Sequence, residues 1–383
     1  MQKHLEELAR ADLLRQEKVL QSPAGPTVSI AGRNVVCLCA NDYLGLANDP
    51  AVQAAAIEAI RRWGVGAAAS RLVSGTSYLH VQLQEALARF KQTESAIVTS
   101  TGWAANQVAI HALAGSGDLI LCDKLNHASI IDAALSSAAR VRTYGHCDLG
   151  RLEDLLKRHR GDHRRCLIVT DSLFSMDGDL APLRELAELK QRYDAQLLID
   201  EAHATGVLGD AGRGAAELLG VEGQVDAVVG TLSKAIGAMG GFVAGPQVLI
   251  DTIRNSGRPY VYTTAIAPAL CGAALAALQI IQTQPQRRTK LLAMAGRLRD
   301  ALQKAGFDLG QSNSQIIPVM VGEAGQAVRM SRCLLEAGFF VPAIRPPTVP
   351  KGKSRLRVSL SSAPDERDLD GFVRTIRQLR TAE

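Results

Sequence analysis

Lys234 lies in a segment whose composition favours a reactive amine. The segment GTLSKAIGAMGG (Gly230–Gly241) places this lysine among small hydroxyl residues and glycines, 34 residues after the carboxyl group of Asp200. Desolvation lowers the pKa of an ammonium group and thereby frees the nucleophilic amine. The pattern therefore predicts an amine that forms a Schiff base with a carbonyl compound. The alternative, on these residues alone, is a flexible glycine loop with a solvated lysine.

A carboxyl group and an imidazole follow another short apolar run. The run AQLLID ends at Asp200, and His203 comes three residues later. Ligands of open α/β sheets bind at the carboxyl ends of strands, and a carboxylate buried there needs a cation as its partner. The protonated ring nitrogen of pyridoxal phosphate would be such a cation, with His203 beside the phenolic oxygen of the ring. The alternative is an aspartate that caps a helix, next to a surface histidine.

Three further turns follow predicted strands. The turn STGWAANQ opens a helix at Gly102 and Trp103, where backbone N–H groups and the helix dipole would hold a phosphate. His127, in DKLNHASIIDA, lies in a loop from which an imidazole would stack on an aromatic cofactor, although a lone loop histidine has no function in most proteins. Ser175, in DSLFSMDGDLAPL, is a further candidate for a hydrogen bond to the cofactor. Together with Lys234, these turns predict one cofactor site.

Alternating short apolar runs and longer segments predict the scaffold that positions these turns. The runs that predict strands are Ser95–Ser100, Asp118–Asp123, Arg140–Gly145, Cys166–Asp171, Gln196–Asp200, Asp226–Gly230 and Gly240–Ala244. Most are separated by enough residues for a helix, as at 152–160 and 183–193. This alternation is typical of an α/β fold with a seven-stranded, mostly parallel sheet flanked by helices on both faces. The last two runs are too close for a helical crossover, so we expect an antiparallel hairpin there.

Breaks in this pattern divide the chain into three parts. Residues 1–48 would form an N-terminal helix, MQKHLEELARADLLRQEK, and a short strand segment. Residues 49–284 would form a large cofactor-binding domain, which includes an alanine-rich helix at 268–282. The linker TQPQRR would lead into a small C-terminal α/β domain at 285–383. Within this small domain the expected elements are helices at 290–304, 326–337 and 365–379 and strands at 315–321 and 355–361.

The composition argues against several classes of protein. The net charge of +5 is spread along the chain and forms no basic stripe with interleaved aromatic residues, so nucleic-acid binding is disfavoured. No apolar run approaches the length that spans a membrane, and the charged N-terminal segment resembles no signal or transit peptide, so we expect a cytoplasmic protein. The seven cysteines include no CxxC pair, and Cys37 and Cys39 alternate on a predicted strand. We therefore expect core packing, with neither disulfides nor a bound metal.

Six motifs together resemble the α-oxoamine synthases, a family of fold-type I pyridoxal-phosphate enzymes, over nearly the whole chain. These motifs are NDYLGLA (Asn41–Ala47), SRLVSGTSYLHVQLQEALA (Ser70–Ala88), NHAS (Asn126–Ser129), FSMDGDLAPL (Phe174–Leu183), DEAHATGVLG (Asp200–Gly209) and TLSKAIGAMGG (Thr231–Gly241). The resemblance implies that Lys234 bonds covalently to the cofactor and transfers a proton, and that Asp200 pairs with the pyridinium nitrogen. It places His203 and Ser175 near the phenolic oxygen and stacks His127 on the ring.

The resemblance also implies contacts to the cofactor phosphate. The subunit that carries Lys234 would contribute the backbone groups of Gly102 and Trp103 and the hydroxyl of Thr231. The neighbouring subunit would contribute Thr264, in YVYTTAIAP. The active site would then require a homodimer. Trp103 and Ala69 stand where other residues are commoner in the family, and both would reshape the substrate channel.

The tail segment AIRPPTVP resembles the branch of the family that condenses L-alanine with a pimeloyl thioester of coenzyme A or an acyl carrier protein. Asn41 and Arg345 match positions that bind the amino-acid carboxylate, for which a guanidinium fork is suited. Arg15 and Thr348 match further substrate contacts, although Arg15 would otherwise be read as a solvated helix residue. The rival within the family is an enzyme that acetylates glycine or uses another acyl chain. A non-catalytic subunit is disfavoured because Lys234 is present, and a nucleotide-binding reductase because no GxGxxG follows a first strand.

Overall fold

A computed structural model describes residues 1–381 of the chain. Their internal contacts divide the chain into two units. We call Asp49–Phe174 with Leu180–Pro285 the large unit, and Met1–Asn48, Ser175–Asp179 and Gln286–Glu383 the small unit. The first 48 residues and the short segment at Ser175–Asp179 thus group with the C-terminal part of the chain.

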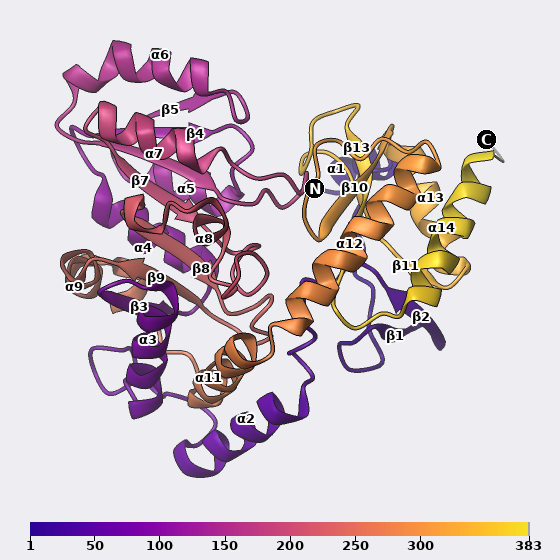
Figure 1. Ribbon diagram of the computed structural model, residues 1–383, viewed down its shortest axis with the longest axis horizontal. Helices are drawn as coiled ribbons and strands as arrows, with labels where there is room; N and C mark the ends of the chain where they lie inside the picture. Colours follow the sequence, from indigo (N-terminus) through magenta and orange to yellow (C-terminus); the bar gives the residue numbers. More distant parts are fainter. Residues whose placement is uncertain (382–383) are drawn as a thin grey trace. The chain divides into compact units, whose positions relative to one another are not determined.

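The large unit is built on a seven-stranded sheet with the strand order β3-β9-β8-β7-β6-β4-β5 (Figure 1). Its strands are β3 (Ser95–Thr99), β4 (Leu119–Asp123), β5 (Arg140–Tyr144), β6 (Cys166–Asp171), β7 (Gln196–Asp200), β8 (Ala227–Thr231) and β9 (Gly241–Gly245). Strand β9 is antiparallel to β3 and β8, and the other pairs are parallel. The predicted mostly parallel sheet and its antiparallel hairpin are therefore confirmed.

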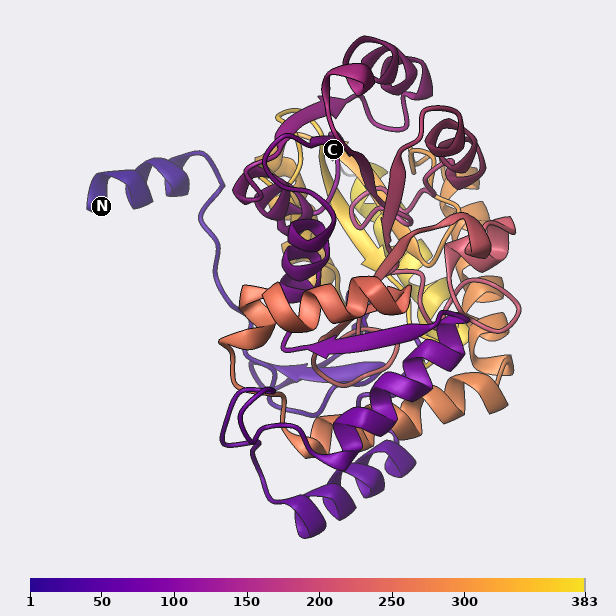
Figure 2. The ribbon, with the colours of Figure 1, turned by 90° about the vertical axis from the view of Figure 1, so that its left-hand side faces the viewer.

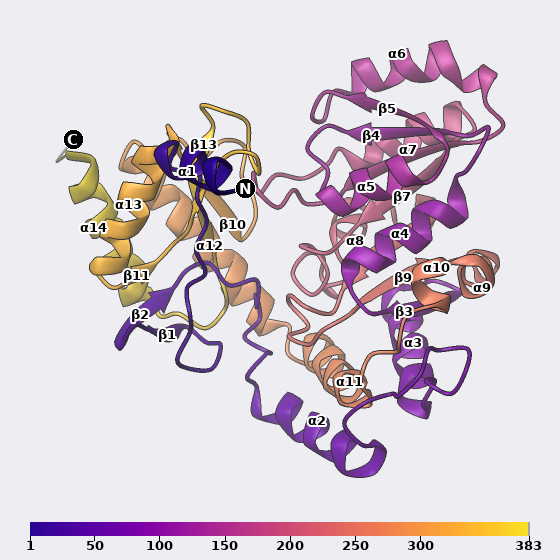
Figure 3. The same cartoon turned by 180° about the vertical axis from the view of Figure 1, so that it is seen from behind.

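Helices cover both faces of this sheet, which is why β4 and β6 are buried at every residue. Helices α4 and α5 lie on one face and α6 and α7 on the other, as right-handed crossovers require (Figures 1 and 3). The helices of the large unit are α2 (Pro50–Trp63), α3 (Tyr78–Lys91), α4 (Gly102–Leu113), α5 (Ala128–Ser136), α6 (Leu149–His159), α7 (Leu183–Arg192), α8 (Ala215–Leu219), α9 (Gln247–Ser256), α10 (Arg258–Val261) and α11 (Pro268–Thr283), with 3₁₀ turns η1 (Arg160–Asp162) and η2 (Glu222–Gln224).

The small unit contains two three-stranded sheets, one ordered β1-β2-β11 and the other β10-β13-β12. Strand β11 pairs in parallel with β2, so residues from distant parts of the sequence share one sheet. Its strands are β1 (Thr27–Ile30), β2 (Arg33–Cys37), β10 (Ile316–Gly322), β11 (Phe339–Phe340), β12 (Ala343–Ile344) and β13 (Ser354–Ser359), and its helices are α1 (Gln2–Arg10), α12 (Gln286–Lys304), α13 (Ala324–Glu336) and α14 (Glu366–Thr381).

The N-terminal helix is shorter than the sequence predicts. Helix α1 ends at Arg10, and the expected continuation through residue 18 is wrong, because Asp12 adopts a left-handed conformation with φ of 56°. The N–H groups of Leu13 and Leu14 turn back to the carbonyl oxygen of Leu8 and close the helix end. Figure 2 shows this short helix followed by irregular chain. Arg15 therefore lies beyond the helix and not within it.

The helices and the cysteines each have one further property that bears on function. Within residues 1–381, no helix is both long and apolar enough to cross a bilayer. All seven cysteines are free thiols, and Cys122, Cys166 and Cys271 are buried in the large unit.

Candidate active site

A cavity of about 170 Å³ opens at the carboxyl ends of the parallel strands in the large unit. Its lining comes from the start of α4, from the last residues of β6, β7 and β8, and from the segments that follow β4, β7 and β8. The lining residues are Gly102, Trp103, Asn106, His127, Ser129, Asp171, Asp200, Ala202, His203, Thr231 and Lys234. Seven of them are residues that the sequence analysis selected, so the sheet brings these side chains to one place.

Lys234 and His203 form a direct contact in this cavity. Nζ of Lys234 lies 2.7 Å from Nε2 of His203. The lysine is half-buried in a tight turn, closed where the N–H of Leu232 donates to the carbonyl oxygen of Gly240 and the N–H of Gly237 donates to that of Lys234. This turn fixes the amine at the end of β8.

Asp200 supplies a buried negative charge. The residue is 5% exposed and ends β7. Its Oδ2 accepts a hydrogen bond of 2.8 Å from the side-chain amide of Asn106, and its Oδ1 accepts one of 2.8 Å from the backbone N–H of Ala202. Both donors are neutral, so the carboxylate remains free to pair with a cationic ligand.

His127 lies on the wall of the cavity at the N-cap of α5. Its Nδ1 lies 2.7 Å from Oγ of Ser129, and Trp103 meets its ring edge-on at a centroid distance of 6.0 Å. Burial lowers the pKa of His127, and nearby Asp200 only partly offsets this effect. The imidazole is therefore neutral at pH 7, as stacking on a cationic ring favours.

Asp171 is a second buried carboxyl group beside Asp200. The two residues are register partners at the ends of the parallel strands β6 and β7. Oδ2 of Asp171 accepts a 2.7 Å hydrogen bond from the backbone N–H of His127. Burial raises the pKa of Asp171 well above its ordinary value, and the negative charge of Asp200 raises it further. Asp171 therefore favours its protonated form, whereas Asp200 beside it accepts hydrogen bonds from two neutral donors.

The N-terminus of α4 faces the same cavity through Gly102 and Trp103. Thr101 caps the helix by accepting a hydrogen bond from the N–H of Ala104. A side chain at Gly102 would have its Cβ 3.3 Å from Cβ of Thr231, so glycine allows a close approach there. A helix N-terminus of this kind attracts anions, including phosphate.

The small unit joins three residues that the sequence analysis assigned to substrate binding. Nη2 of Arg15 donates a 2.9 Å hydrogen bond to Oγ1 of Thr348, across 333 residues of sequence. Nη2 of Arg345 donates to the carbonyl oxygen of Leu14 at 2.6 Å. Burial lowers the pKa of Arg345, and the charge of Arg15 lowers it further. The carboxylate of Asp12 acts in the opposite direction and raises this pKa.

Asn41 and Ser175 also lie in the small unit, where both contact Arg357. The side chain of Arg357 is buried, and its Nε donates a 2.5 Å hydrogen bond to the carbonyl oxygen of Ser175. Its two terminal nitrogens approach Oδ1 of Asn41 at 3.4 Å, and Tyr43 donates to the same oxygen at 3.3 Å. The guanidinium group next to Asn41 is therefore that of Arg357.

Thr264 lies outside the cavity that contains Lys234. It is exposed, pairs with Ser70 through an isolated β-bridge, and lines a small separate pocket with Arg71 and Tyr260. In one chain, therefore, the structure does not bring Thr264 to the other predicted cofactor contacts.

Four residues around these sites were not predicted from the sequence: Asn106, Ser129, Asp171 and Arg357. Asn106 comes four residues after Gly102, so the helical period places both on one face of α4. Asp171 ends an apolar run as Asp200 does, and this repetition could have revealed it. Arg357 follows the tail motif on β13 and gave no comparable signal.

Comparisons with known proteins identify the family. Residues 33–376 match the family described as aminotransferase class I and II. An 8-amino-7-oxononanoate synthase from Geobacter sulfurreducens is 48% identical over 371 residues, covering 96% of this chain and 95% of that protein. One from Anaeromyxobacter dehalogenans is 49% identical over 369 residues, covering 96% of this chain and 92% of that protein. The chain belongs to the 8-amino-7-oxononanoate synthase family.

Solved structures agree with this family assignment at the level of the fold. A serine palmitoyltransferase from S. paucimobilis with a bound PLP–myriocin aldimine has a TM-score of 0.95 at 32% identity, covering 99% of this chain and 96% of that one. An 8-amino-7-oxononanoate synthase from Francisella tularensis has a TM-score of 0.79 at 27% identity, covering 91% of this chain and 98% of that one. The predicted fold-type I architecture is therefore confirmed.

Membership of the 8-amino-7-oxononanoate synthase family makes this chain an acyltransferase that depends on pyridoxal 5′-phosphate, as predicted. The residues of the cavity fit that cofactor by their chemistry. They combine an amine at Lys234, a buried carboxylate with only neutral donors at Asp200, a neutral imidazole at His127 and an open helix N-terminus at Gly102.

Proposed function

We propose that this enzyme condenses L-alanine with a pimeloyl thioester and releases carbon dioxide and the thiol carrier, which gives 8-amino-7-oxononanoate for biotin synthesis. The observation that carries this proposal is the single cavity that holds Lys234, His203 and Asp200, in a chain that is 48% identical to a named 8-amino-7-oxononanoate synthase. The carrier is coenzyme A or an acyl carrier protein, which share a phosphopantetheine thiol.

Lys234 would bind the cofactor covalently and then move protons at the substrate. Bound pyridoxal phosphate supplies a carbonyl group for amines and a ring that delocalises the electron pair left at Cα of the amino acid. Asp200 would hold the ring nitrogen as a cation, and His127 would stack on the ring. Nζ of Lys234 would take the Cα proton of alanine, and His203, 2.7 Å away, would receive or return a proton at this amine.

The remaining contacts would orient the cofactor. The N–H groups at Gly102 and Trp103 would bind its phosphate through the N-terminus of α4, and the hydroxyl of Thr231 would bind the same group. Ser175 would lie near the phenolic oxygen together with His203. These positions would keep the ring fixed while the bonds at Cα break and form.

The cationic residues of the small unit would bind the anionic ends of the substrates. The candidates that would bind the carboxylate of alanine are Arg345 and the pair formed by Asn41 and Arg357, which contact each other. Arg15 and Thr348 are hydrogen-bonded to each other, and together they would bind the acyl substrate. A pimeloyl chain is anionic at its far end, so the positive charge of Arg15 and Arg345 suits it.

We further propose a homodimer with shared active sites. Thr264 is exposed and lies outside the cavity of its own chain, as a phosphate contact donated to the neighbouring subunit requires. The oligomeric state would be measured by light scattering. Lys234→Ala, which lacks the reactive amine, would be mixed with Thr264→Ala, which would lose one phosphate contact. A shared site predicts that one site of each mixed dimer regains both residues, so the activity of the mixture should exceed the sum of the separate variants.

A product assay tests the reaction. The enzyme would be incubated with L-alanine, glycine or L-serine and with pimeloyl, acetyl or palmitoyl thioesters, and the products would be identified by mass. We expect a product from alanine with the pimeloyl thioester, together with one equivalent of carbon dioxide. A product from glycine with acetyl-CoA, and none from alanine with pimeloyl thioesters, would contradict the proposal.

A further inference from the structure

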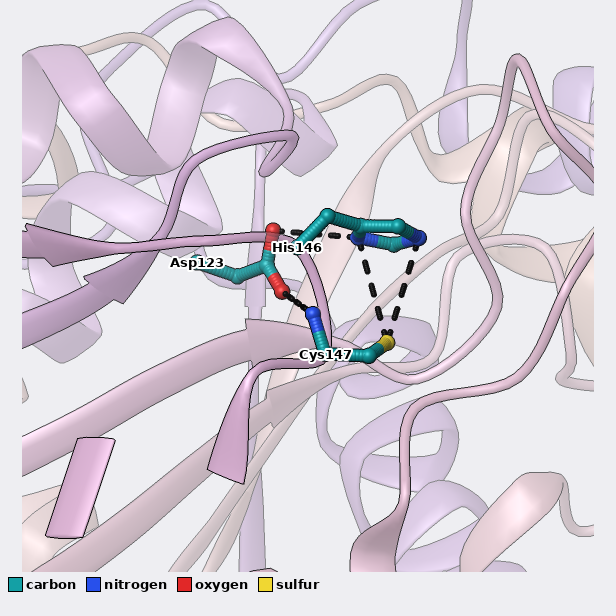
Figure 4. A group of neighbouring side chains, drawn as sticks. All are labelled: Asp123, His146 and Cys147. Carbon is teal, nitrogen blue, oxygen red and sulfur yellow. Dashed lines mark hydrogen bonds and ion pairs between the residues drawn. The ribbon is translucent and has the colours of Figure 1, made fainter. Parts of the chain in front are cut away.

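Three residues with metal-binding side chains meet at one edge of the large sheet, outside the lining of the cavity that holds Lys234. Asp123 ends β4, and His146 and Cys147 follow β5. Strands β4 and β5 are parallel, and Asp123 is the register partner of Tyr144, so the turns after both strands lie side by side. Figure 4 shows the three side chains converging.

The spacing of their ligand atoms is close to that of a metal complex. Nδ1 of His146 lies 3.2 Å from Oδ1 of Asp123, and Sγ of Cys147 lies 3.8 Å from both ring nitrogens of His146. One ligand atom from each residue falls within 4.8 Å of the others. In a tetrahedral zinc site, bonds of about 2.0–2.3 Å place ligand atoms about 3.3–3.7 Å apart. To complete the site, the Cys147 side chain would rotate so that Sγ moves from the face of the imidazole toward Nδ1 of His146.

Other contacts hold these ligands in place. Oδ2 of Asp123 accepts a 2.7 Å hydrogen bond from the backbone N–H of Cys147, and Oδ1 accepts one of 2.8 Å from the N–H of Leu125. The imidazole of His146 meets the ring of Phe174 edge-on, with the centroids 4.4 Å apart. The side chain of Asp123 is only 1% exposed, whereas His146 and Cys147 are half-buried. A metal ion would therefore meet oriented ligands on one side and solvent on the other.

We propose that Asp123, His146 and Cys147 bind one zinc ion, with water as the fourth ligand. A thiolate with an imidazole favours a borderline metal, whereas magnesium and calcium prefer sites made only of oxygen. Binding releases the thiol proton of Cys147 to solvent, and the metal takes the lone pair of Nδ1 of His146 while the ring proton resides on Nε2. None of the three residues lines the cavity that holds Lys234.

The role of this site would be structural. Zinc would join the turn after β4 to the turn after β5, and His127 comes four residues after Asp123 along the chain. The ion would thereby fix the segment that leads to the wall of the cavity. Since zinc binds the folded state, it would raise the melting temperature, and above the Kd each tenfold increase in free zinc would add a similar increment of stability.

Zinc titration of the holoenzyme tests this proposal. The protein would first be dialysed against a chelator, and its zinc affinity then measured by competition with a chromophoric chelator. We expect one zinc ion per chain. Cys147→Ser should weaken binding at least about tenfold, whereas Cys333→Ser, at a half-buried thiol on α13, should leave it unchanged.

A second variant and a spectroscopic measurement complete the test. His146→Asn should also lose the zinc and the zinc-dependent rise in melting temperature, and the melting temperature without zinc would verify that both variants fold. Zinc X-ray absorption should give one sulfur neighbour near 2.3 Å in the wild type and none in Cys147→Ser. Absence of zinc binding in the wild type, or equal zinc binding by Cys147→Ser and Cys333→Ser, would overturn the proposal.

Discussion

Nζ of Lys234 lies 2.7 Å from Nε2 of His203, so amine and imidazole share one hydrogen bond. The ammonium form of Lys234 can donate this bond only when Nε2 carries no proton, and the neutral amine can accept it only when Nε2 does. A single proton thus connects two nitrogens that follow two neighbouring strands, β8 and β7. This arrangement is suited to a residue that must lose a proton to bind the cofactor and later carry one.

Lys234→Ala should abolish both the covalent attachment of pyridoxal phosphate and the condensation. The visible absorption of the purified protein reports the attachment, and product formation would fall by at least about 10³-fold, since general-base catalysis contributes 10² to 10⁴. Lys304→Ala removes an exposed lysine at the end of α12 and should change neither property. An unchanged visible spectrum in Lys234→Ala would refute the role of this lysine.

Two aspartates should change stability with pH in opposite directions. Burial, and then the charge of Asp200, raise the pKa of Asp171, so above about pH 4 the folded state retains a proton that the unfolded state loses. Stability contributed by this proton falls as pH rises. Asp171→Asn keeps an acceptor for the N–H of His127 but cannot titrate. In urea unfolding, the stability of the wild type relative to Asp171→Asn should therefore decrease from pH 4 to pH 8.

Asp118 provides the matched control for this measurement. Burial opposes its ionisation, but hydrogen bonds from Arg164 and Arg165 outweigh that effect and hold the pKa of Asp118 below its ordinary range. Its stabilisation is present at neutral pH and is lost as pH falls below about 4. Asp118→Asn should cost about 1.5–3 kcal/mol at pH 7 and progressively less in acid. The same sign of pH dependence in both variants would contradict the assignment.

The strands of the large sheet could be predicted from the sequence because each is a short, continuous apolar run between breaker residues, whereas their order in the sheet was not predicted. The run ending at Asp200, for example, has the same limit in the structure. The end of α1 could not be predicted, because the amphipathic pattern continues past Arg10 and only the backbone of Asp12 terminates the helix.

The candidate site was predictable where function depends on one turn, as at Lys234, and not where it depends on tertiary contacts. Asn106 matters only because β7 places Asp200 within 2.8 Å of its amide. Arg15 meets Thr348 only because the small unit brings distant segments together. His146 and Cys147 are adjacent in sequence, but Asp123 lies 23 residues earlier than His146, a spacing that matches no local metal motif.

Arg15 and Thr348 should act as one unit in binding the acyl substrate. Their 2.9 Å hydrogen bond fixes the guanidinium group, so Arg15→Ala and Thr348→Val should each raise the KM for the pimeloyl thioester about tenfold with little change in kcat. The double variant should lose hardly more than either single variant, because both remove the same interaction. Arg10→Ala, at an exposed position on α1, is the control. An equal effect of Arg10→Ala, or full additivity of the pair, would count against this role.

Gly230 should tolerate no side chain, because β8 and β9 pack it against an aromatic ring. A Cβ at this position would lie 2.3 Å from Cζ of Phe242, its register partner, and Phe242 is fully buried. Gly230→Ala should therefore cost about 1–3 kcal/mol and displace the adjoining turn that carries Lys234. Gly223→Ala is the matched control, since its Cβ would have no neighbour within 4 Å.

Calorimetry and cofactor retention would together separate a packing defect from a chemical one at Gly230. Gly230→Ala should unfold at a lower temperature and release pyridoxal phosphate more readily on dialysis than Gly223→Ala. Removing the ring with Phe242→Leu should recover part of this loss in the double variant, because the added methyl group then has space. If Gly230→Ala were as stable as Gly223→Ala, the close packing of β8 on β9 could not be what positions Lys234.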